Sequence, residues 1–307
     1  MKTRRIGSLV VSEVGLGCNN FGSRLDAAAT AAVVHESLRQ GVTFFDTADM
    51  YGGTKSEEFL GRALGGHRRE VVVATKFGMA IDADRKGASS AYVRRALEDS
   101  LRRLGTDWVD LYQLHQPDPA TPIADTLGAL NELVREGKVR EIGCSNFSAA
   151  QLLEAESVVG PDRAHFVSLQ NQYSLLHRDP EREELALCER LGVAFVPYFP
   201  LTSGLLTGKY AQGVPAPAGS RLSAAAAASR FITDERLARV EALADFARSR
   251  GHSILELAIS WLLARRVVAS VINGATKPEQ IRANVQAASW HLSADDLTAI
   301  DRIAPVS

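Results

Sequence analysis

The sequence predicts an α/β fold in which eight parallel strands close into a (β/α)8 (TIM) barrel, as one domain over residues 1–307. Short apolar runs alternate with amphipathic helical segments, and no change in composition marks a linker. Such alternation gives a parallel sheet. Eight units in about 250 to 300 residues favour a closed barrel over an open doubly wound sheet.

The apolar runs are the expected strands, and they are 14–17, 42–45, 71–75, 109–114, 141–144, 166–169, 194–197 and 267–272. The expected helices are 26–40, 56–65, 91–104, 181–191, 234–250, 254–264 and 278–288, with two more starting at Thr121-Pro122 and at Ser148. Ser56, Thr121, Ser148 and Ser253 are the expected caps, and Pro122 is the expected first helical residue.

Three segments lie outside this alternation. An N-terminal β-hairpin is expected over 4–11, turning on Gly7-Ser8, as a plug or cap for the barrel. Residues 202–229, rich in Gly, Pro and Ala, are expected to cross the surface. An extra C-terminal helix is expected over 294–303.

Composition bounds the function. With 46% hydrophobic residues the chain can bury a sizeable core, and a net charge of −1 favours neither nucleic acid nor an anionic membrane. No run approaches the length of a membrane span, and the polar start lacks a signal-peptide core. The cysteines Cys18, Cys144 and Cys188 fit reduced thiols, and no zinc-site spacing occurs. We therefore expect a cytoplasmic protein without a metal.

Two nucleotide-binding motifs are rejected. Gly15-Leu-Gly17-Cys-Asn-Asn20 has Asn20 where the third glycine of a dinucleotide fingerprint belongs, and no helix opens on it. Gly52-Gly-Thr-Lys-Ser56 lacks the first glycine of a P-loop. A nucleophile elbow is absent, and no base is placed beside Ser145, which follows a strand.

Polar residues follow three consecutive strands at the points where these strands end. Asp46, Lys76 and His115 end the second, third and fourth expected strands, and Tyr51 lies in the loop after Asp46. In a parallel barrel these strand ends share the face on which active sites form. Taken singly, each residue fits a structural role, as a loop cap, a solvated charge, a wall residue or a satisfied polar group. Together they predict a proton-transfer site.

The chemistry of the four groups is complementary. A phenol has a pKa near ~10 in water, so Tyr51 needs help to act as an acid at neutral pH. The Lys76 ammonium would lower that pKa by stabilising the phenolate, and Asp46 would hold the ammonium in place. His115 can donate a hydrogen bond to a carbonyl oxygen and orient it.

The sequence resembles the aldo-keto reductases almost from end to end. The stretches that carry the resemblance are VGLG (14–17), FDTADMYG (45–52), ATKF (74–77), DLYQLH (110–115), IGCSNF (142–147), QNQY (170–173), SGLLTGKY (203–210) and GATKPEQ (274–280). Each is weak alone, but their order and spacing are specific. The resemblance implies a TIM barrel that binds NADP(H) without a Rossmann domain and reduces aldehydes or ketones. Hydride would leave the nicotinamide while Tyr51, within the tetrad Asp46, Tyr51, Lys76 and His115, protonates the oxygen.

The resemblance also implies the cofactor residues. Ser145, Asn146 and Gln170 match residues that hold the carboxamide, and Tyr198 matches the aromatic that stacks on the nicotinamide. The loop over the pyrophosphate carries over as Phe199, Leu201, Ser203, Gly204, Leu205 and Lys209. The pocket for the 2′-phosphate and adenine carries over as Gly274, Thr276, Gln280 and Asn284.

Two departures from the family pattern bear on the cofactor. Phe199 stands where a serine is common, so only backbone can contact phosphate there. Gly274 and Gln280 stand where some members carry Lys and Arg, which weakens charge-assisted binding of the 2′-phosphate. Lys277 either supplies a positive charge for the 2′-phosphate in their place or is a solvated lysine at a helix start. NADPH is the expected cofactor, and NADH stays open.

The substrate and the assembly are less defined. The expected substrate walls are the loop residues around Tyr51, namely Asn20, Phe21, Met50, Phe77, Met79 and Gln116. Their mixed character suggests a roomy pocket for a small carbonyl compound. A barrel of this kind is self-sufficient, so a monomer is expected.

Two alternatives come from other functional classes. The sequence also resembles the potassium-channel β-subunit branch of the family, which suggests an NADP(H)-binding regulatory or redox-sensing subunit with slow turnover. A Schiff-base aldolase built on Lys76 is the third reading, because lysines at barrel strand ends form imines.

Overall fold

The computed structural model of the chain describes residues 1–160, 163–211, 214–218, 220–223 and 232–306. Eight parallel strands form one sheet in the order β10-β3-β4-β5-β6-β7-β8-β9. Their bounds are β3 Val14–Gly17, β4 Phe44–Asp46, β5 Val72–Phe77, β6 Val109–Leu114, β7 Val139–Ser145, β8 Phe166–Gln170, β9 Ala194–Phe195 and β10 Val271–Gly274.

The two edges of this sheet meet, so the sheet is a barrel. Phe195 of β9 forms a parallel bridge with Val268, just before β10. The Phe195 N–H donates to the Val267 carbonyl at 2.8 Å, and the Phe195 carbonyl accepts from Ala269 N–H at 3.0 Å. The predicted TIM barrel is confirmed.

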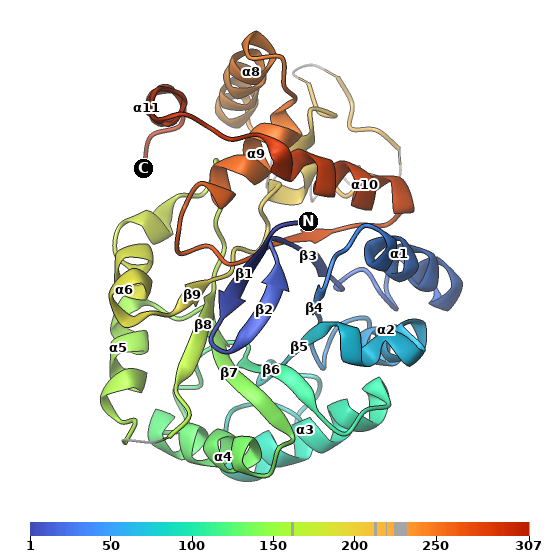
Figure 1. The fold of residues 1–307 in the computed structure, drawn as a ribbon, viewed down its shortest axis with the longest axis vertical. Coiled ribbons are helices and arrows are strands. Elements are labelled where there is room, and N and C mark those ends of the chain that lie inside the picture. The colour runs from blue at the N-terminus through green and yellow to red at the C-terminus, as the bar shows by residue number, and fades with distance from the viewer. Residues whose placement is uncertain (161–162, 212–213, 219, 224–231, 307) are drawn as a thin grey trace.

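Helices surround the strands on the outside of the barrel (Figure 1). They are α1 Ala27–Arg39, α2 Lys55–Leu64, α3 Ser90–Leu104, α4 Ile123–Arg135, α5 Ala149–Ser157, α6 Glu184–Leu191, α8 Asp234–Ser249, α9 Ile254–Leu263, α10 Pro278–Gln286 and α11 Ala294–Ile303. Short 3₁₀ turns are η1 Gly65–Glu70, η2 Asp179–Glu181, η3 Thr202–Thr207 and η4 Ala287–Ser289. α11 is the extra C-terminal helix expected from the sequence.

The N-terminal hairpin closes the amino end of the barrel, as predicted. Its strands β1 Thr3–Ile6 and β2 Leu9–Ser12 pair in antiparallel register across Gly7-Ser8. Ile6, Leu9 and Val11 form one apolar cluster with inward-facing strand residues that include Phe44 and Leu111. The hairpin therefore supplies the floor of the barrel interior.

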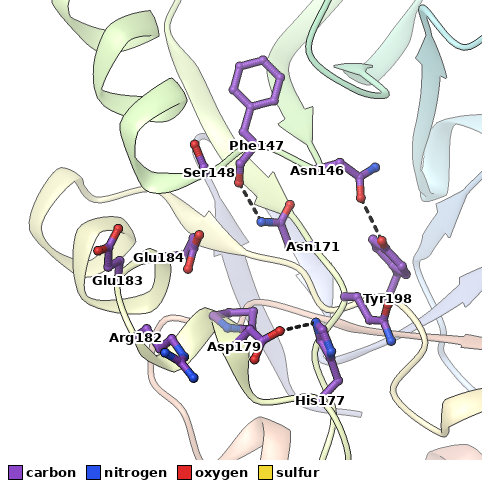
Figure 2. Close-up of a pocket in the computed structure, with 12 residues that line it drawn as sticks. Asn146, Phe147, Ser148, Asn171, His177, Asp179, Arg182, Glu183, Glu184 and Tyr198 are labelled. Carbon is purple, nitrogen blue, oxygen red and sulfur yellow. Dashed lines mark hydrogen bonds and ion pairs between the residues drawn. The ribbon is translucent and has the colours of Figure 1, made fainter. Parts of the chain in front are cut away.

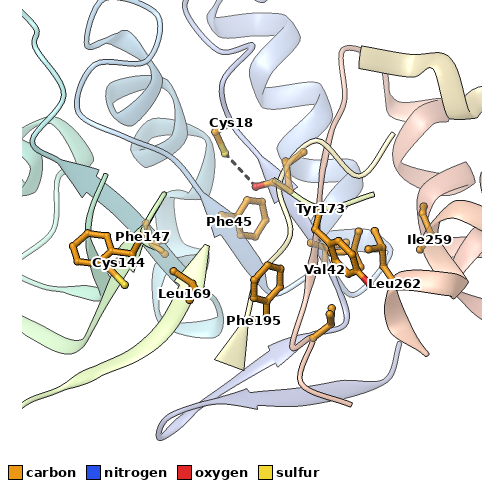
Figure 3. Packing of buried hydrophobic residues seen from close by; sticks show 14 of the residues in the cluster. Cys18, Val42, Phe45, Cys144, Phe147, Leu169, Tyr173, Phe195, Ile259 and Leu262 are labelled. Atoms are coloured by element: carbon orange, nitrogen blue, oxygen red, sulfur yellow. Dashed lines mark hydrogen bonds between the residues drawn. The ribbon is translucent and has the colours of Figure 1, made fainter. Parts of the chain in front are cut away.

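Alternation along the strands separates two apolar layers. Phe44, Val72 and Leu111 belong to the interior cluster, whereas the next residues Phe45, Val73 and Tyr112 pack outward against the helices. Figure 3 shows part of this outer layer around Phe45 and Leu169. Because side chains alternate along a strand, residues an even number of places after an interior one also point inward, as Lys76 does four places after Val72. This places Asp46, Lys76 and Gln113 inside the carboxyl end of the barrel.

Two predicted helix starts are wrong. Ser56 does not cap α2, which begins at Lys55 after a left-handed Thr54 that makes no side-chain cap bond. The Ser56 hydroxyl instead donates to the Cys18 carbonyl at 2.9 Å and lies 2.8 Å from the Thr47 hydroxyl. It therefore joins α2 to the ends of β3 and β4.

Pro122 is the cap of α4 rather than its first helical residue, because the helix begins at Ile123. The Thr121 hydroxyl, expected to cap, donates to the Asp118 carboxylate at 2.8 Å. The predicted capping boxes at Ser148 and Ser253 are confirmed.

Three strand or helix bounds also differ. The last strand is displaced from 267–272 to β10 because the first residues of that run form the closing bridge. The second strand begins at Phe44, since Val42 N–H still donates to Ser37 in the last turn of α1. A 3₁₀ turn occupies 179–181, and α6 begins only at Glu184.

Three further expectations concern the surface segment before α8, the cysteines and the absence of membrane spans. The excursion expected over 202–229 is described only in part, with 212–213, 219 and 224–229 outside the described residues. The three cysteines are buried and free. Among the described helices, none is both long and apolar enough to cross a bilayer.

Neighbouring residues on β2 test the floor of the barrel. Leu9 is 2% exposed and Val10 is 49% exposed. Leu9→Ala should lower the free energy of unfolding by about 2–5 kcal/mol, because it leaves a cavity in the interior cluster. Val10→Ala, the matched control, should change it by less than about 0.5 kcal/mol. Urea denaturation measures both, and equal effects would contradict the plug.

Candidate active site

A buried ion pair lies at the centre of the carboxyl end of the barrel. Lys76 Nζ donates to Asp46 Oδ2 at 2.5 Å and to the Thr47 carbonyl at 2.9 Å. The Lys76 side chain is 0% exposed. A buried ammonium is stable only beside an opposite charge. Lys76 can therefore remain charged because the Asp46 carboxylate lies next to it.

Two amides complete the surroundings of Asp46. Gln113 Nε2 and Gln170 Nε2 donate to Asp46 Oδ1 at 3.1 and 3.0 Å. Gln170 was expected to hold a ligand carboxamide, and in this structure its amide N–H₂ is directed at Asp46. Gln113 was missed in the sequence, although its position two residues after the interior Leu111 is the signal that could have found it.

Tyr51 lies on the loop between β4 and α2, close to this ion pair. Lys76 Nζ is 5.3 Å from the centroid of the Tyr51 ring. The neighbouring Gly52 has φ +59°, and a Cβ there would lie 2.1 Å from the Phe21 carbonyl. Only glycine allows the β3 loop to pack this closely against the Tyr51 loop.

The protonation states follow from burial and from the ion pair. Burial raises the pKa of the Tyr51 phenol, and this outweighs the lowering by the Lys76 ammonium. The lowering expected from the sequence is therefore present, but it is the smaller effect. Burial is the largest single effect and lowers the pKa of Lys76, but the charge of Asp46, that of an ionised Tyr51 and the hydrogen bond to Asp46 together raise it above its usual value. At neutral pH Tyr51 holds its proton and Lys76 is charged.

His115 is neutral beside Tyr51. Its ring meets the Tyr51 ring edge-on, with 5.7 Å between centroids. Burial, followed by the Lys76 charge, lowers the pKa of His115 to about 3. Its Nδ1 is buried without a hydrogen-bond partner among the described residues. A neutral imidazole can donate one hydrogen bond and accept another, so it can orient an oxygen without carrying charge.

The four expected nicotinamide residues are assembled beside His115. Asn146, with left-handed φ of 61°, donates from Nδ2 to the His115 carbonyl at 2.8 Å. The Tyr198 hydroxyl donates to Asn146 Oδ1 at 2.8 Å, and the Ser145 hydroxyl donates to the Gln170 carbonyl at 2.7 Å. The structure thus brings these residues together at one side of the barrel mouth.

A cavity of about 450 Å³ opens next to this group (Figure 2). Asn146 and Tyr198 line it, and so do Asn171, His177 and Asp179. None of Asp46, Tyr51, Lys76 and His115 lines it.

The expected pyrophosphate loop has an unusual backbone. Phe199, Thr202 and Ser203 all have positive φ, at 53°, 44° and 57°, and Gly204 follows at 95°. Phe199 is exposed, Leu201 and Ser203 are half-buried, and Leu205 is buried. Successive N–H groups in such conformations form concave sites for anions. Lys209 lies beside this turn, with Nζ 5.3 Å from the Tyr210 ring centroid.

The expected 2′-phosphate and adenine residues cluster at the start of α10. The Gln280 Oε1 accepts from Thr276 N–H at 2.7 Å and from its hydroxyl at 3.2 Å. Asn284 is buried one turn further along, and Gly274 and Lys277 are exposed. Lys277 is the residue before the first turn of α10.

Arg221 was missed in the sequence. It lies in the long segment before α8 and donates to Asn20 Oδ1 at 3.0 Å, while Asn20 Nδ2 donates to the Ala275 carbonyl at 3.3 Å. This contact brings a cation next to the α10 cluster. No local sequence signal distinguishes Arg221, because its place depends on the path of the chain.

The expected substrate residues divide into two groups. Met50 and Met79 are half-buried and Gln116 is exposed, whereas Asn20 is buried. Phe21 and Phe77 are fully buried in the outer core, where Phe77 stacks on Tyr112 with 4.6 Å between ring centroids. These two phenylalanines present no surface in this structure.

Comparison with known proteins gives the family. The family model for the aldo/keto reductases matches residues 13–305. The chain belongs to the aldo/keto reductase family. Membership implies NAD(P)H-dependent reduction of carbonyl compounds.

Individual members of the aldo/keto reductase family are similar over nearly the whole chain. A "Probable voltage-gated potassium channel subunit beta" of Oryza sativa subsp. japonica is 37% identical over 94% of this chain and 91% of its own. An uncharacterized oxidoreductase of Bacillus subtilis (strain 168) is 36% identical over 97% of this chain and 93% of its own. The structure of an aldo-keto reductase from Bacillus halodurans in its holo form superposes with a TM-score of 0.84 at 34% identity, covering 100% of this chain and 97% of that one.

The ion pair can be tested through stability. Lys76→Met should lower the free energy of unfolding by about 3–5 kcal/mol, because it leaves the Asp46 carboxylate buried without its counter-charge. The double variant Asp46→Asn/Lys76→Met should be less destabilised than Lys76→Met alone. Urea denaturation of the parent, Asp46→Asn, Lys76→Met and the double variant measures this, and simple additivity of the two changes would show that they are not paired.

Proposed function

We propose that the chain is an NADPH-dependent oxidoreductase that reduces aldehydes or ketones to alcohols, with Tyr51 as the proton donor. One observation carries the proposal most directly. A protonated phenol, a charged ammonium and a neutral imidazole converge at the carboxyl end of the barrel, at Tyr51, Lys76 and His115. Such groups can protonate a carbonyl oxygen, stabilise the resulting phenolate and orient the oxygen.

The residues divide the work as follows. The nicotinamide supplies a hydride, which forms the new C–H bond at the carbonyl carbon. Tyr51 transfers its hydroxyl proton to the carbonyl oxygen, and the resulting phenolate regains a proton from solvent. Lys76 stabilises the phenolate, and Asp46 keeps Lys76 charged and in place. His115 orients the carbonyl oxygen by a hydrogen bond.

The residues beside the tetrad suit a dinucleotide. Ser145, Asn146 and Gln170 carry hydroxyl and amide groups for the carboxamide, with Tyr198 beside them as the stacking aromatic. In the turn at 199–204 the Thr202 and Gly204 N–H groups already donate to the Phe199 and Leu201 carbonyls at 3.0 and 2.8 Å, so the Ser203 N–H between them is the group that would meet a pyrophosphate. Leu201, Leu205 and Lys209 would be its side walls. The amino end of α10 offers its N–H groups to a phosphate next to Gly274, Thr276, Gln280 and Asn284.

Charge supports NADPH over NADH. Gly274 and Gln280 stand where some family members carry Lys and Arg. In this chain Arg221 and Lys277 supply two cations near the start of α10 instead. We propose that they contact the cofactor phosphates. Met50, Met79 and Gln116 would form the substrate wall, with Asn20, Phe21 and Phe77 as buried support behind it. One domain and one copy of the chain supply all these residues, so a monomer stays our prediction.

Tyr51→Phe tests the proton donor. It should lower kcat about 10²–10⁴-fold, since that is the usual contribution of general acid catalysis. The Kd for NADPH should stay near that of the parent protein, because the ring is kept. Absorbance of the reduced nicotinamide with a panel of carbonyl compounds gives kcat, and fluorescence titration gives Kd. Undiminished turnover would remove Tyr51 from this role.

Lys277→Ala tests the 2′-phosphate pocket. The Kd for NADPH should rise severalfold while that for NADH stays the same, because only NADPH carries the 2′-phosphate. Arg221→Ala is the companion variant. If it raises the Kd for NADH as well as the Kd for NADPH, Arg221 lies at the pyrophosphate. Equal Kd values for parent and Lys277→Ala would make Lys277 a solvated lysine.

A second function is favoured by the potassium-channel-subunit relative. Under that function the chain would bind NADPH tightly and consume it slowly. The titration followed by carbonyl addition separates the two. Binding with consumption supports the reductase, and binding without consumption on any carbonyl supports a redox-sensing subunit.

A further inference from the structure

A second carboxyl group on the Tyr51 loop is buried without a partner. Asp49 lies two residues before Tyr51 and is 1% exposed. Neither of its carboxylate oxygens has a side-chain hydrogen-bond partner among the described residues, and the Met50 backbone N–H is the one hydrogen-bond donor that lowers its pKa. Its backbone N–H donates to the Lys76 carbonyl at 3.0 Å, which fixes the main chain beside β5. A buried carboxylate normally has several hydrogen-bond donors around it, so the lack of side-chain donors at Asp49 needs an explanation.

The neighbours of Asp49 explain why donors are lacking. The adjacent Glu57 of α2 is 0% exposed and already takes the nearby donors, the Thr75 hydroxyl at 2.5 Å and Arg103 Nε at 2.7 Å. Tyr92 of α3 and Tyr112 of β6 also face Asp49, since its charge raises the pKa of both phenols. The charged and titratable groups around Asp49 are thus Glu57, Arg103, Tyr92, Tyr112 and Lys76.

We propose that Asp49 is a positioning residue for Tyr51, and that its uncharged form holds the 47–56 loop in place whereas its ionised form loosens that loop. The proposal rests on the proposed role of Tyr51 as proton donor. It adds a group that controls where the donor lies rather than one that touches substrate.

Electrostatics gives the reason. When Asp49 is a carboxylic acid, Glu57 and Arg103 form one neutral pair and the interior is balanced. When Asp49 ionises, two buried carboxylates share one guanidinium, and like charges in a low-dielectric interior repel strongly. Asp49 is on the loop, whereas Glu57 is fixed by β5 and α3. The repulsion is therefore relieved by moving the loop.

The loop is poised to transmit such a movement. It is joined to the helix end by the Thr47–Ser56 hydroxyl contact at 2.8 Å and to Lys76 through the Thr47 carbonyl. In the sequence Tyr51 lies between Thr47 and Ser56. Its N–H donates to the Ala48 carbonyl at 3.2 Å. A shift at Asp49 thus changes the approach of the phenol to Lys76 and His115.

The pH dependence can be assigned to one group. Burial, followed by Glu57, raises the pKa of Asp49 to about 7. The pKa of His115 is lowered to about 3, and those of Tyr51 and Lys76 are raised above their usual values near ~10. Between pH 5 and 9 these three groups therefore keep their protonation states, with His115 and Tyr51 neutral and Lys76 charged. Among them and Asp49, only Asp49 titrates in that range.

Stability should change with pH in the matching direction. The folded chain keeps a proton on Asp49 between about pH 4 and 7, which the unfolded chain has released. Stability from this group is therefore highest at the acid end of that range, falls as pH rises, and is constant above about pH 7. The Asn side chain, which is never charged, removes this fall.

The test compares the parent chain with Asp49→Asn and Glu57→Gln between pH 5.5 and 8.5. In the parent, kcat should fall about 10-fold from pH 6 to pH 8, as the protonated fraction of a group with pKa about 7 does. The Kd for NADPH should not change. Asp49→Asn should keep at pH 8 the kcat that the parent has at pH 6. Glu57→Gln should move the midpoint to lower pH, because it removes the charge that opposes ionisation.

Two readouts do not need turnover. Hydrogen exchange of residues 47–56, corrected for intrinsic rates, should increase from pH 6 to pH 8 in the parent but not in Asp49→Asn. Urea midpoints over the same range should fall in the parent only. If no carbonyl is reduced, the proposed function fails while these two readouts still decide on Asp49. Parallel pH profiles of parent and Asp49→Asn in exchange and stability, or a fall in kcat that persists in Asp49→Asn, would overturn the proposal.

Discussion

The buried ion pair between Lys76 and Asp46 is the interaction on which the rest of the site depends. An ammonium with no exposure stays charged only if an opposite charge meets it directly. The pair is held by four strands, because Asp46 ends β4, Lys76 lies in β5, and the amides that complete Asp46 come from β6 and β8. The barrel must therefore close correctly for the pair to form, and the hairpin at the opposite end fills the interior beneath it.

This pair sets the character of the groups above it. Burial keeps the proton on the Tyr51 phenol, while the Lys76 ammonium of the pair lowers the phenol's pKa and Asp46 raises it. The same ammonium helps to keep His115 neutral. One interior contact therefore prepares an acid and an uncharged hydrogen-bond donor. On the other side of the Tyr51 loop, Asp49 lies near Glu57 and Arg103, and we propose that this side responds to pH.

Much of the barrel and of its candidate site could be predicted from the sequence, because these features depend on local sequence patterns. Strand ends followed by polar residues located Asp46, Lys76 and His115, and the capping boxes at Ser148 and Ser253 use partners three residues apart. The failures involve partners distant in the chain. Ser56 bonds to Cys18 rather than to its own helix, and the run at 267–269 is used to close the barrel. Gln113, Arg221 and the isolation of Asp49 depend on packing that no window of sequence contains. The roles of the individual cofactor and substrate residues remain predictions.

The charge state of Lys76 tests the account most directly. Its side-chain ¹⁵N and ¹H signals, assigned by their loss in Lys76→Met, can be followed by NMR as pH is raised. The account predicts that Lys76 remains an ammonium beyond its usual pKa near ~10.4, because Asp46 raises its pKa. Loss of the proton well below that value would contradict the account, since an uncharged amine could neither hold Asp46 nor stabilise a Tyr51 phenolate.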